Sequence, residues 1–238
     1  MRILIALFLS VGLFADNEIY IDQTGDNASI DIEQLGSTNI IGGDDAVAGT
    51  MTAAVLNGGT MTLDINQIGS SNKFLTDGIY GTNFTGFFEF DGDSNEWDFS
   101  MDTSGLNTAD SNDINIDVTG SFNLADIDIA EVSGASFLDI DWIITGDSND
   151  AEVDIDADYA KMYMDIFGDS NDLTFIQSGY GASSSDRKYF SLDLDGSNNT
   201  AVIKQQSTLA ADWLTIESNA SNSNICVIQN DGGTTTSC

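Results

Sequence analysis

The chain is most regular from Leu138 to Ile155, which reads LDIDWIITGDSNDAEVDI. Before Gly146 every second residue is apolar, and the same alternation resumes after Asn149. The residues between the apolar ones are mostly acidic, as at Asp139 and Asp141. Alternation with a period of two predicts a β-strand that has one buried and one solvated face. The stretch therefore predicts two strands, joined by a tight arc, that turn the same kind of face inward.

The same arc recurs along the chain as a glycine, two small or polar residues, and an asparagine. Successive glycines lie 11 to 33 residues apart, and the apolar alternation keeps its parity across the arcs. Repeats of this length are typical of solenoids, in which each coil buries its face against its neighbours. We therefore predict a single all-β solenoid of about eight strand-arc-strand coils over residues 16–238. The arc residues are Gly25 and Asn27 (a contracted copy), Gly36 and Asn39, Gly69 and Asn72, Gly92 and Asn95, Gly120 and Asn123, Gly146 and Asn149, Gly168 and Asn171, and Gly196 and Asn199, with a degenerate copy around Ser218 to Asn222.

Both residue types suit such arcs. Glycine adopts backbone conformations that other residues resist. Asparagine tolerates left-handed geometry and can bond the backbone of its own turn. Stacked asparagines are also expected to form a ladder inside the solenoid.

The composition excludes several classes of function. The 238 residues include 39 acidic and 6 basic side chains, so the formal net charge is −33, and there is no histidine or proline. Nucleic-acid binding needs clustered Lys and Arg, so no nucleic-acid partner is expected. The lack of histidine removes the commonest general base, and no catalytic motif stands out, so we predict that the chain is not an enzyme. A content of 41% hydrophobic residues argues against disorder, and the absence of proline suits a chain made of strands.

Residues 1–15 have the pattern of a secretory signal peptide, with Arg2, an apolar run from Ile3 to Phe14, and a small residue at Ala15. The run is too short to span a membrane, so we predict secretion to the extracellular space or cell surface and no integral membrane span. Outside the cytoplasm Cys226 and Cys238 can pair, but such a disulfide closes only the last residues of the chain. Burial of Cys226 as a small apolar residue is the simpler expectation.

The repeat resembles the curlin repeat of curli-type amyloid fibre subunits, whose pattern is approximately Ser-x5-Gln-x-Gly-x-x-Asn-x-Ala-x3-Gln. The closest stretches are Gln23-Thr24-Gly25-Asp26-Asn27-Ala28, Gln34-Leu35-Gly36-Ser37-Thr38-Asn39 and Gln67-Ile68-Gly69-Ser70-Ser71-Asn72. Ala125, Ala151 and Ala201 match the alanine of the pattern. From Gly92 onward the first glutamine is replaced by Phe90, Val118, Ile144, Ile166 and Leu194.

This resemblance implies a secreted β-solenoid subunit that stacks end to end into curli-like surface fibres and supports adhesion or biofilm. It also implies an amide ladder, for which the candidates are Gln23, Gln34, Gln67, Gln177 and Gln205. The expected partners are copies of the chain or related curlin-like subunits. The alternative is a non-polymerising surface or phage-particle recognition module, or adhesin, whose inserted loops contact a cell surface or glycans.

The acidic strand positions are the candidate metal site. Carboxylates at Asp139, Asp141, Asp150, Glu152 and Asp154 would stack between coils and repel one another, which favours divalent cations or high salt. Calcium is therefore the one cofactor considered, and calcium-dependent adhesion is a variant of the alternative function. The simpler interpretation is a solvated outer face that resists sideways aggregation. By the same parity Trp97 and Trp142 are expected in the core. Trp213 is expected to face outward if Leu214 and Ile216 face in, and there it could pack under a terminal loop or a neighbour.

Overall fold

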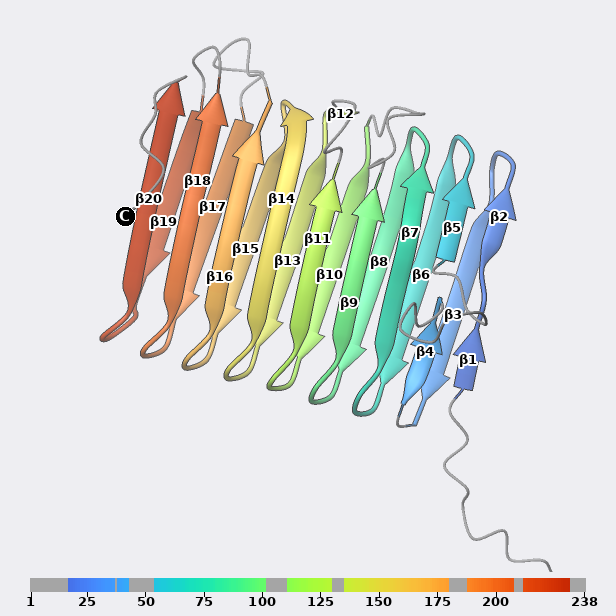
Figure 1. The fold of residues 1–238 in the computed structure, drawn as a ribbon, viewed down its shortest axis with the longest axis horizontal. Coiled ribbons are helices and arrows are strands. Elements are labelled where there is room, and N and C mark those ends of the chain that lie inside the picture. Colours follow the sequence, from blue (N-terminus) through green and yellow to red (C-terminus); the bar gives the residue numbers. More distant parts are fainter. Residues whose placement is uncertain are drawn as a thin grey trace, which may run out of the picture.

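The computed structural model describes residues 17–36, 38–42, 54–101, 111–129, 135–179, 188–207 and 212–231, and in these residues it contains strands and no helix. The strands form two parallel sheets that face each other along the length of the molecule (Figure 1). The first sheet holds β1 (Asn17–Ile19), β2 (Asp22–Thr24), β4 (Asn39–Ile41), β5 (Ala54–Asn57), β7 (Lys73–Tyr80), β9 (Glu96–Met101), β11 (Leu124–Ile129), β12 (Ala135–Ser136), β14 (Asp150–Asp158), β16 (Asp172–Ser178), β18 (Thr200–Ser207) and β20 (Asn224–Asp231). The second sheet holds β3 (Ser29–Leu35), β6 (Met61–Ile68), β8 (Phe84–Asp91), β10 (Asp113–Thr119), β13 (Asp139–Thr145), β15 (Lys161–Phe167), β17 (Lys188–Asp195) and β19 (Asp212–Ser218).

The chain alternates between the sheets, so each coil is a strand of the second sheet, an arc, and a strand of the first sheet. The predicted all-β solenoid is confirmed. Six strands of the second sheet have a neighbour on both sides, which gives about six interior turns with a further strand pair at each end. The expected count of about eight coils differs slightly from this number of turns because it included the end pairs.

The strands form where apolar and polar residues alternate, and parallel pairing then places like residues next to one another. Ile116, Trp142 and Met164 are register partners in β10, β13 and β15, and each is at most 5% exposed. Trp97 and Trp142 are inward and buried as expected, with ring centroids 5.9 Å apart. The core is therefore one continuous apolar column between the sheets.

The arcs that lead from the second sheet to the first share one backbone pattern. In the arc of Gly146, that glycine has φ +145° and Ser148, two residues later, has φ +60°. The residue before each arc asparagine thus takes the left-handed conformation, and it is usually serine. The arc asparagines themselves do not take this conformation, because their side chains bond neighbouring coils inside the solenoid. Asn198, which precedes Asn199, and Asn222 in the degenerate copy do take it.

The contracted copy at Gly25 lies on the opposite edge of the solenoid, where the chain passes from the first sheet to the second. The backbone N–H groups of Gly25 and Asn27 donate to Asn57 O and Gly59 O, so this arc stacks on the arc of Gly58 and Gly59. Its asparagine has φ +60° and is exposed, so here the left-handed expectation is confirmed. Gly25 and Asn27 are therefore not part of the asparagine column, contrary to their assignment as a contracted copy of the same arc.

Candidate functional site

The predicted asparagine ladder is present along the arc edge. The backbone N–H of each asparagine donates to the side-chain Oδ1 of the asparagine one coil later, as from Asn123 to Asn149 at 3.0 Å and from Asn149 to Asn171 at 2.8 Å. The chain of bonds runs through Asn39, Asn72, Asn95, Asn123, Asn149, Asn171 and Asn199, all at most 4% exposed. It ends at Ser223, whose Oγ accepts from Asn199 N–H at 3.0 Å. Some side chains also bond their own turn, as Asn72 Nδ2 does to Gly69 O at 2.9 Å.

The glutamines form two separate ladders rather than one. In the second sheet, Gln67 Nε2 donates to Gln34 Oε1 at 2.7 Å, and the row continues through Phe90 and the other apolar residues that replace glutamine. In the first sheet, Gln205 Nε2 donates to Gln177 Oε1 at 3.0 Å, and Gln229 Nε2 donates to Gln205 Oε1 at 2.8 Å.

Two glutamines depart from the expectation. Gln229 was missed, although it lies 24 residues after Gln205 and follows the same alternation. Gln23 belongs to neither ladder, and its Nε2 lies 3.5 Å from the carbonyl oxygen of Gly25 in its own turn. It is the inward-facing residue of β2 at the end of the first sheet, in register with buried Leu56.

The two ends of the solenoid leave inward-facing apolar side chains partly uncovered. We define the N-terminal rim as Ile19, Ile21, Ile30 and Ile32, and the C-terminal rim as Leu214, Ile216, Ile225 and Val227. Seven of these eight are partly buried and pack against the core on one side, and Val227 is 41% exposed. Their register partners one coil inward are covered: Ile203, beside Val227, is 0% exposed. The rims therefore expose the section of the core that the next coil covers everywhere else.

The five candidate metal ligands do not form one site. Asp139 and Asp141 lie on the outer face of β13 in the second sheet, whereas Asp150, Glu152 and Asp154 lie on the outer face of β14 in the first sheet. Each sits in an acidic row, since Asp139 is the register partner of Asp113, and Glu152 of Asp126. Among the residues that the structure describes, no group of three or more Asp, Glu, Cys or His is arranged to hold a metal ion. Calcium binding stays a prediction.

The rows do affect ionisation. Partial burial raises the pKa of the Asp141 carboxyl, and the neighbouring Asp139, Asp113 and Asp165 raise it further. Asp150 has its pKa raised by burial and then by Asp172 and Glu152. The outer faces are therefore crowded with like charge, which opposes sideways contact between molecules at neutral pH.

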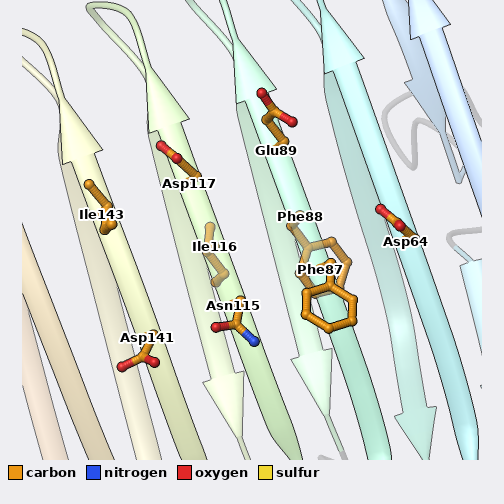
Figure 2. Close-up of a pocket in the computed structure, with 9 residues that line it drawn as sticks. All are labelled: Asp64, Phe87, Phe88, Glu89, Asn115, Ile116, Asp117, Asp141 and Ile143. Atoms are coloured by element: carbon orange, nitrogen blue, oxygen red, sulfur yellow. The ribbon is translucent and has the colours of Figure 1, made fainter.

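A shallow groove of about 370 Å³ crosses the outer face of the second sheet. Figure 2 shows its side chains succeeding one another across neighbouring strands, with Phe87 on β8 between Asp64 on β6 and Asn115 on β10. Phe87 is 44% exposed, and Glu89, Asp117 and Asp141 complete an acidic border. Sequence reasoning missed this groove because it arises where an aromatic residue interrupts a polar row.

A buried ion pair was also missed. Lys188 opens β17 and Asp212 opens β19, and both face into the solenoid, where their side chains are 0% and 6% exposed. The alternation that places Leu214 inward also places Asp212 inward, so the position of Asp212 in this alternation was the only indication of the pair in the sequence.

The remaining candidates lie near the C-terminal end. Trp213 is outside the core as expected, 47% exposed, and its Nε1 donates to Thr215 Oγ1 at 3.2 Å. Cys226 is 7% exposed and disulfide-bonded, and its register partner is Val202 on the outer face of the first sheet. Cys238 and the signal segment 1–15 lie outside the described residues, so the disulfide pairing and the secretion signal stay predictions.

No protein-family model, curated protein or solved structure matches the chain. Within the residues described, no helix is long and apolar enough to cross a membrane.

Proposed function

We propose that the chain is a secreted, non-enzymatic structural subunit of curli-like surface fibres that stacks end to end and supports adhesion or biofilm. The observation that carries the proposal is the uncovered core at the rims. Val227 is 41% exposed although its partner one coil inward is fully buried. Within the described part of the chain, the strands at both ends of each sheet pair on one side only. Open strand edges recruit further strands through main-chain hydrogen bonds.

The spacing of the two rims supports a second copy as the occupant. In the first sheet the C-terminal rim presents Ile225, Val227 and Gln229 inward, and the N-terminal rim presents Ile19, Ile21 and Gln23 at the same spacing. Stacking in register would set apolar residues against apolar residues. It would also bring Gln23 of one copy to Gln229 of the other, which would extend the ladder of Gln177 and Gln205.

The number of strand rows sets where copies meet. In the described residues the first sheet has nine rows and the second has eight, because β1 and β2 precede β3. Continuing the coil therefore sets β20 of one copy against β1 and β2 of the next. The second sheet then has room for one more strand between β19 and the β3 that follows.

A rim variant tests the proposal. Val227→Asp places a charge in the contact between copies, so we expect strongly delayed fibre growth. Because Val227 is already exposed in the monomer, we expect the stability of the monomer to be unchanged. Phe122→Asp is the matched control, because Phe122 is 67% exposed on an arc, away from the rims. Electron microscopy and light scattering follow growth in both. Equal growth of the two variants would contradict the proposed contact.

The groove of Figure 2 favours the second candidate, a recognition module that does not polymerise. An exposed aromatic ring bordered by carboxylates and an amide offers a stacking surface together with hydrogen-bond acceptors. Wild-type monomers that persist at every salt and calcium concentration, together with glycan or cell binding lost in Phe87→Ala, would favour this function over the fibre.

A further inference from the structure

Lys188 and Asp212 break the pattern that the rest of the solenoid follows. They occupy one inward row of the second sheet, whose other members are Met61, Phe84, Asn112, Leu138 and Ala160. The other charged side chains in these strands whose exposure the structure describes face outward. A departure from an otherwise consistent pattern is where function or chemistry is expected.

The two side chains are in reach of each other and shielded from water. Lys188 Nζ lies 3.2 Å from Asp212 Oδ1, and the side chains are 0% and 6% exposed. Nζ also donates to Gln206 O at 2.7 Å, which holds the amine in place. Burial lowers the pKa of the Lys188 ammonium, and the charges of Asp212, Asp156 and Asp158 partly oppose this shift by raising the pKa.

Burial sets this pair apart from a second in-register Lys–acid pair. Lys73 Nζ lies 2.7 Å from Glu96 Oε2, but these side chains are 32% and 42% exposed. Water therefore solvates both charges there. At Lys188 the charges are shielded from water, and burial disfavours the charged form of the amine.

We propose that Lys188 and Asp212 condense into an intramolecular isopeptide bond. The ammonium first gives one proton to the carboxylate. The Nζ lone pair then attacks Asp212 Cγ, a second N–H proton passes to the leaving hydroxyl, and the Cγ–O bond breaks. One amide and one water molecule form, so atoms and charges balance and no oxidant or other reactant is needed.

The product suits its surroundings. The amide is neutral, so it removes the cost of the two buried charges, and its remaining N–H can keep the bond to Gln206 O. The link joins β17 to β19, the terminal strand of the second sheet. It would therefore pin the last coil of the described residues, whose strands pair on one side only, to the body of the solenoid.

Peptide mapping of the purified full chain after reduction tests the proposal. Trypsin would be unable to cut after Lys188, and peptide 188–204 would be joined to the peptide that begins at Gln205, with a combined mass lower by one water molecule. The pair Lys73 and Glu96 is the internal control and should give ordinary linear peptides. A linear peptide 189–204 at its full mass in the wild type would overturn the proposal, whatever the variants do.

Two variants separate the cross-link from other dehydrations. Lys188→Arg keeps the positive charge but cannot form the amide, so its peptides should be linear at full mass. Asp212→Ala removes the carbon that Nζ attacks, so its peptides should also be linear at full mass. A water loss that persists in Lys188→Arg would place the dehydration elsewhere and contradict the proposal.

Discussion

The column of arc glycines gives the sharpest test of how closely the coils stack. Gly146 has φ +145°, and a Cβ there would overlap the carbonyl oxygen of Gly120 in the preceding coil. Gly36 has a similar φ of +136° but is the first of the column, and the nearest heavy atom to its added Cβ is Asn39 Oδ1 at 3.8 Å. Alanine at either position would suffer the same backbone strain, which destabilises the folded state by about 1–3 kcal/mol. The steric clash is present only at Gly146.

The clash sets the size of the difference. Backbone cannot move aside as a flexible side chain does, so the two arcs must separate, which stretches the 2.8 Å bond from Gly120 N–H to Thr145 O. Overpacking of this kind costs about 1–3 kcal/mol. Gly146→Ala should therefore lower the free energy of unfolding by about 1–3 kcal/mol more than Gly36→Ala does.

Urea unfolding followed by the fluorescence of the buried tryptophans measures this difference. The midpoint for Gly146→Ala should lie clearly below that for Gly36→Ala, with similar slopes. Equal midpoints would show that the arc glycines serve only their own backbone conformation, and would refute the close stacking of coils inferred here.

Two further predictions concern the polar rows. Asp141→Asn should raise the free energy of unfolding at pH 7 by about 0.2–1 kcal/mol, because it removes a carboxylate crowded by like charges. Because the pKa of Asp141 is raised in the folded state, that state takes up protons at a higher pH than the unfolded state does. The loss of stability caused by the Asp141 charge is therefore present at neutral pH and disappears as pH falls toward the ordinary Asp pKa of 3.8. Over this pH range the wild-type thermal midpoint should rise, and the stability gain of Asp141→Asn should vanish. Asn149→Ala should lower stability by about 1–3 kcal/mol because it leaves the buried N–H of Asn123 without its 3.0 Å acceptor, whereas Asn219→Ala, at an exposed position, should leave the urea midpoint unchanged.

The alternation of residues was enough to predict the sheets and the core. Parity across the arcs placed Trp97, Trp142 and Trp213 on their correct faces, because a strand turns successive side chains to opposite sides. The spacing of the glycines predicted the column of arcs, and the asparagines predicted the ladder. These features are local, so they can be read from one short stretch at a time.

What the sequence left open depends on which coil lies beside which. The contracted motif at Gly25 resembles the other arcs, but only its pairing with Gly58 shows that it lies on the opposite edge. Likewise Gln34 and Gln177 match one repeat pattern yet lie in different sheets. The candidate metal ligands were grouped by closeness in sequence, and the arc between Asp141 and Asp150 carries them to opposite faces.

The pairing of Lys188 with Asp212 could not be predicted from the sequence for a different reason. Each residue has a visible parity, but a single charged residue at an inward position is most simply explained as a loop or strand-end residue. Only the register of β17 and β19 brings the two together and makes burial tolerable. The chemistry proposed for them depends on that pairing.

Cryo-electron microscopy of the purified mature chain, incubated at moderate salt and mildly acidic pH, shows directly whether copies of the chain stack end to end. We expect unbranched filaments in which strands lie across the axis with a spacing of about 4.8 Å, with β20 of one copy beside β1 and β2 of the next. Monomers that persist under all salt, calcium and pH conditions would contradict this expectation, as would filaments in which the rims of the solenoid remain uncovered.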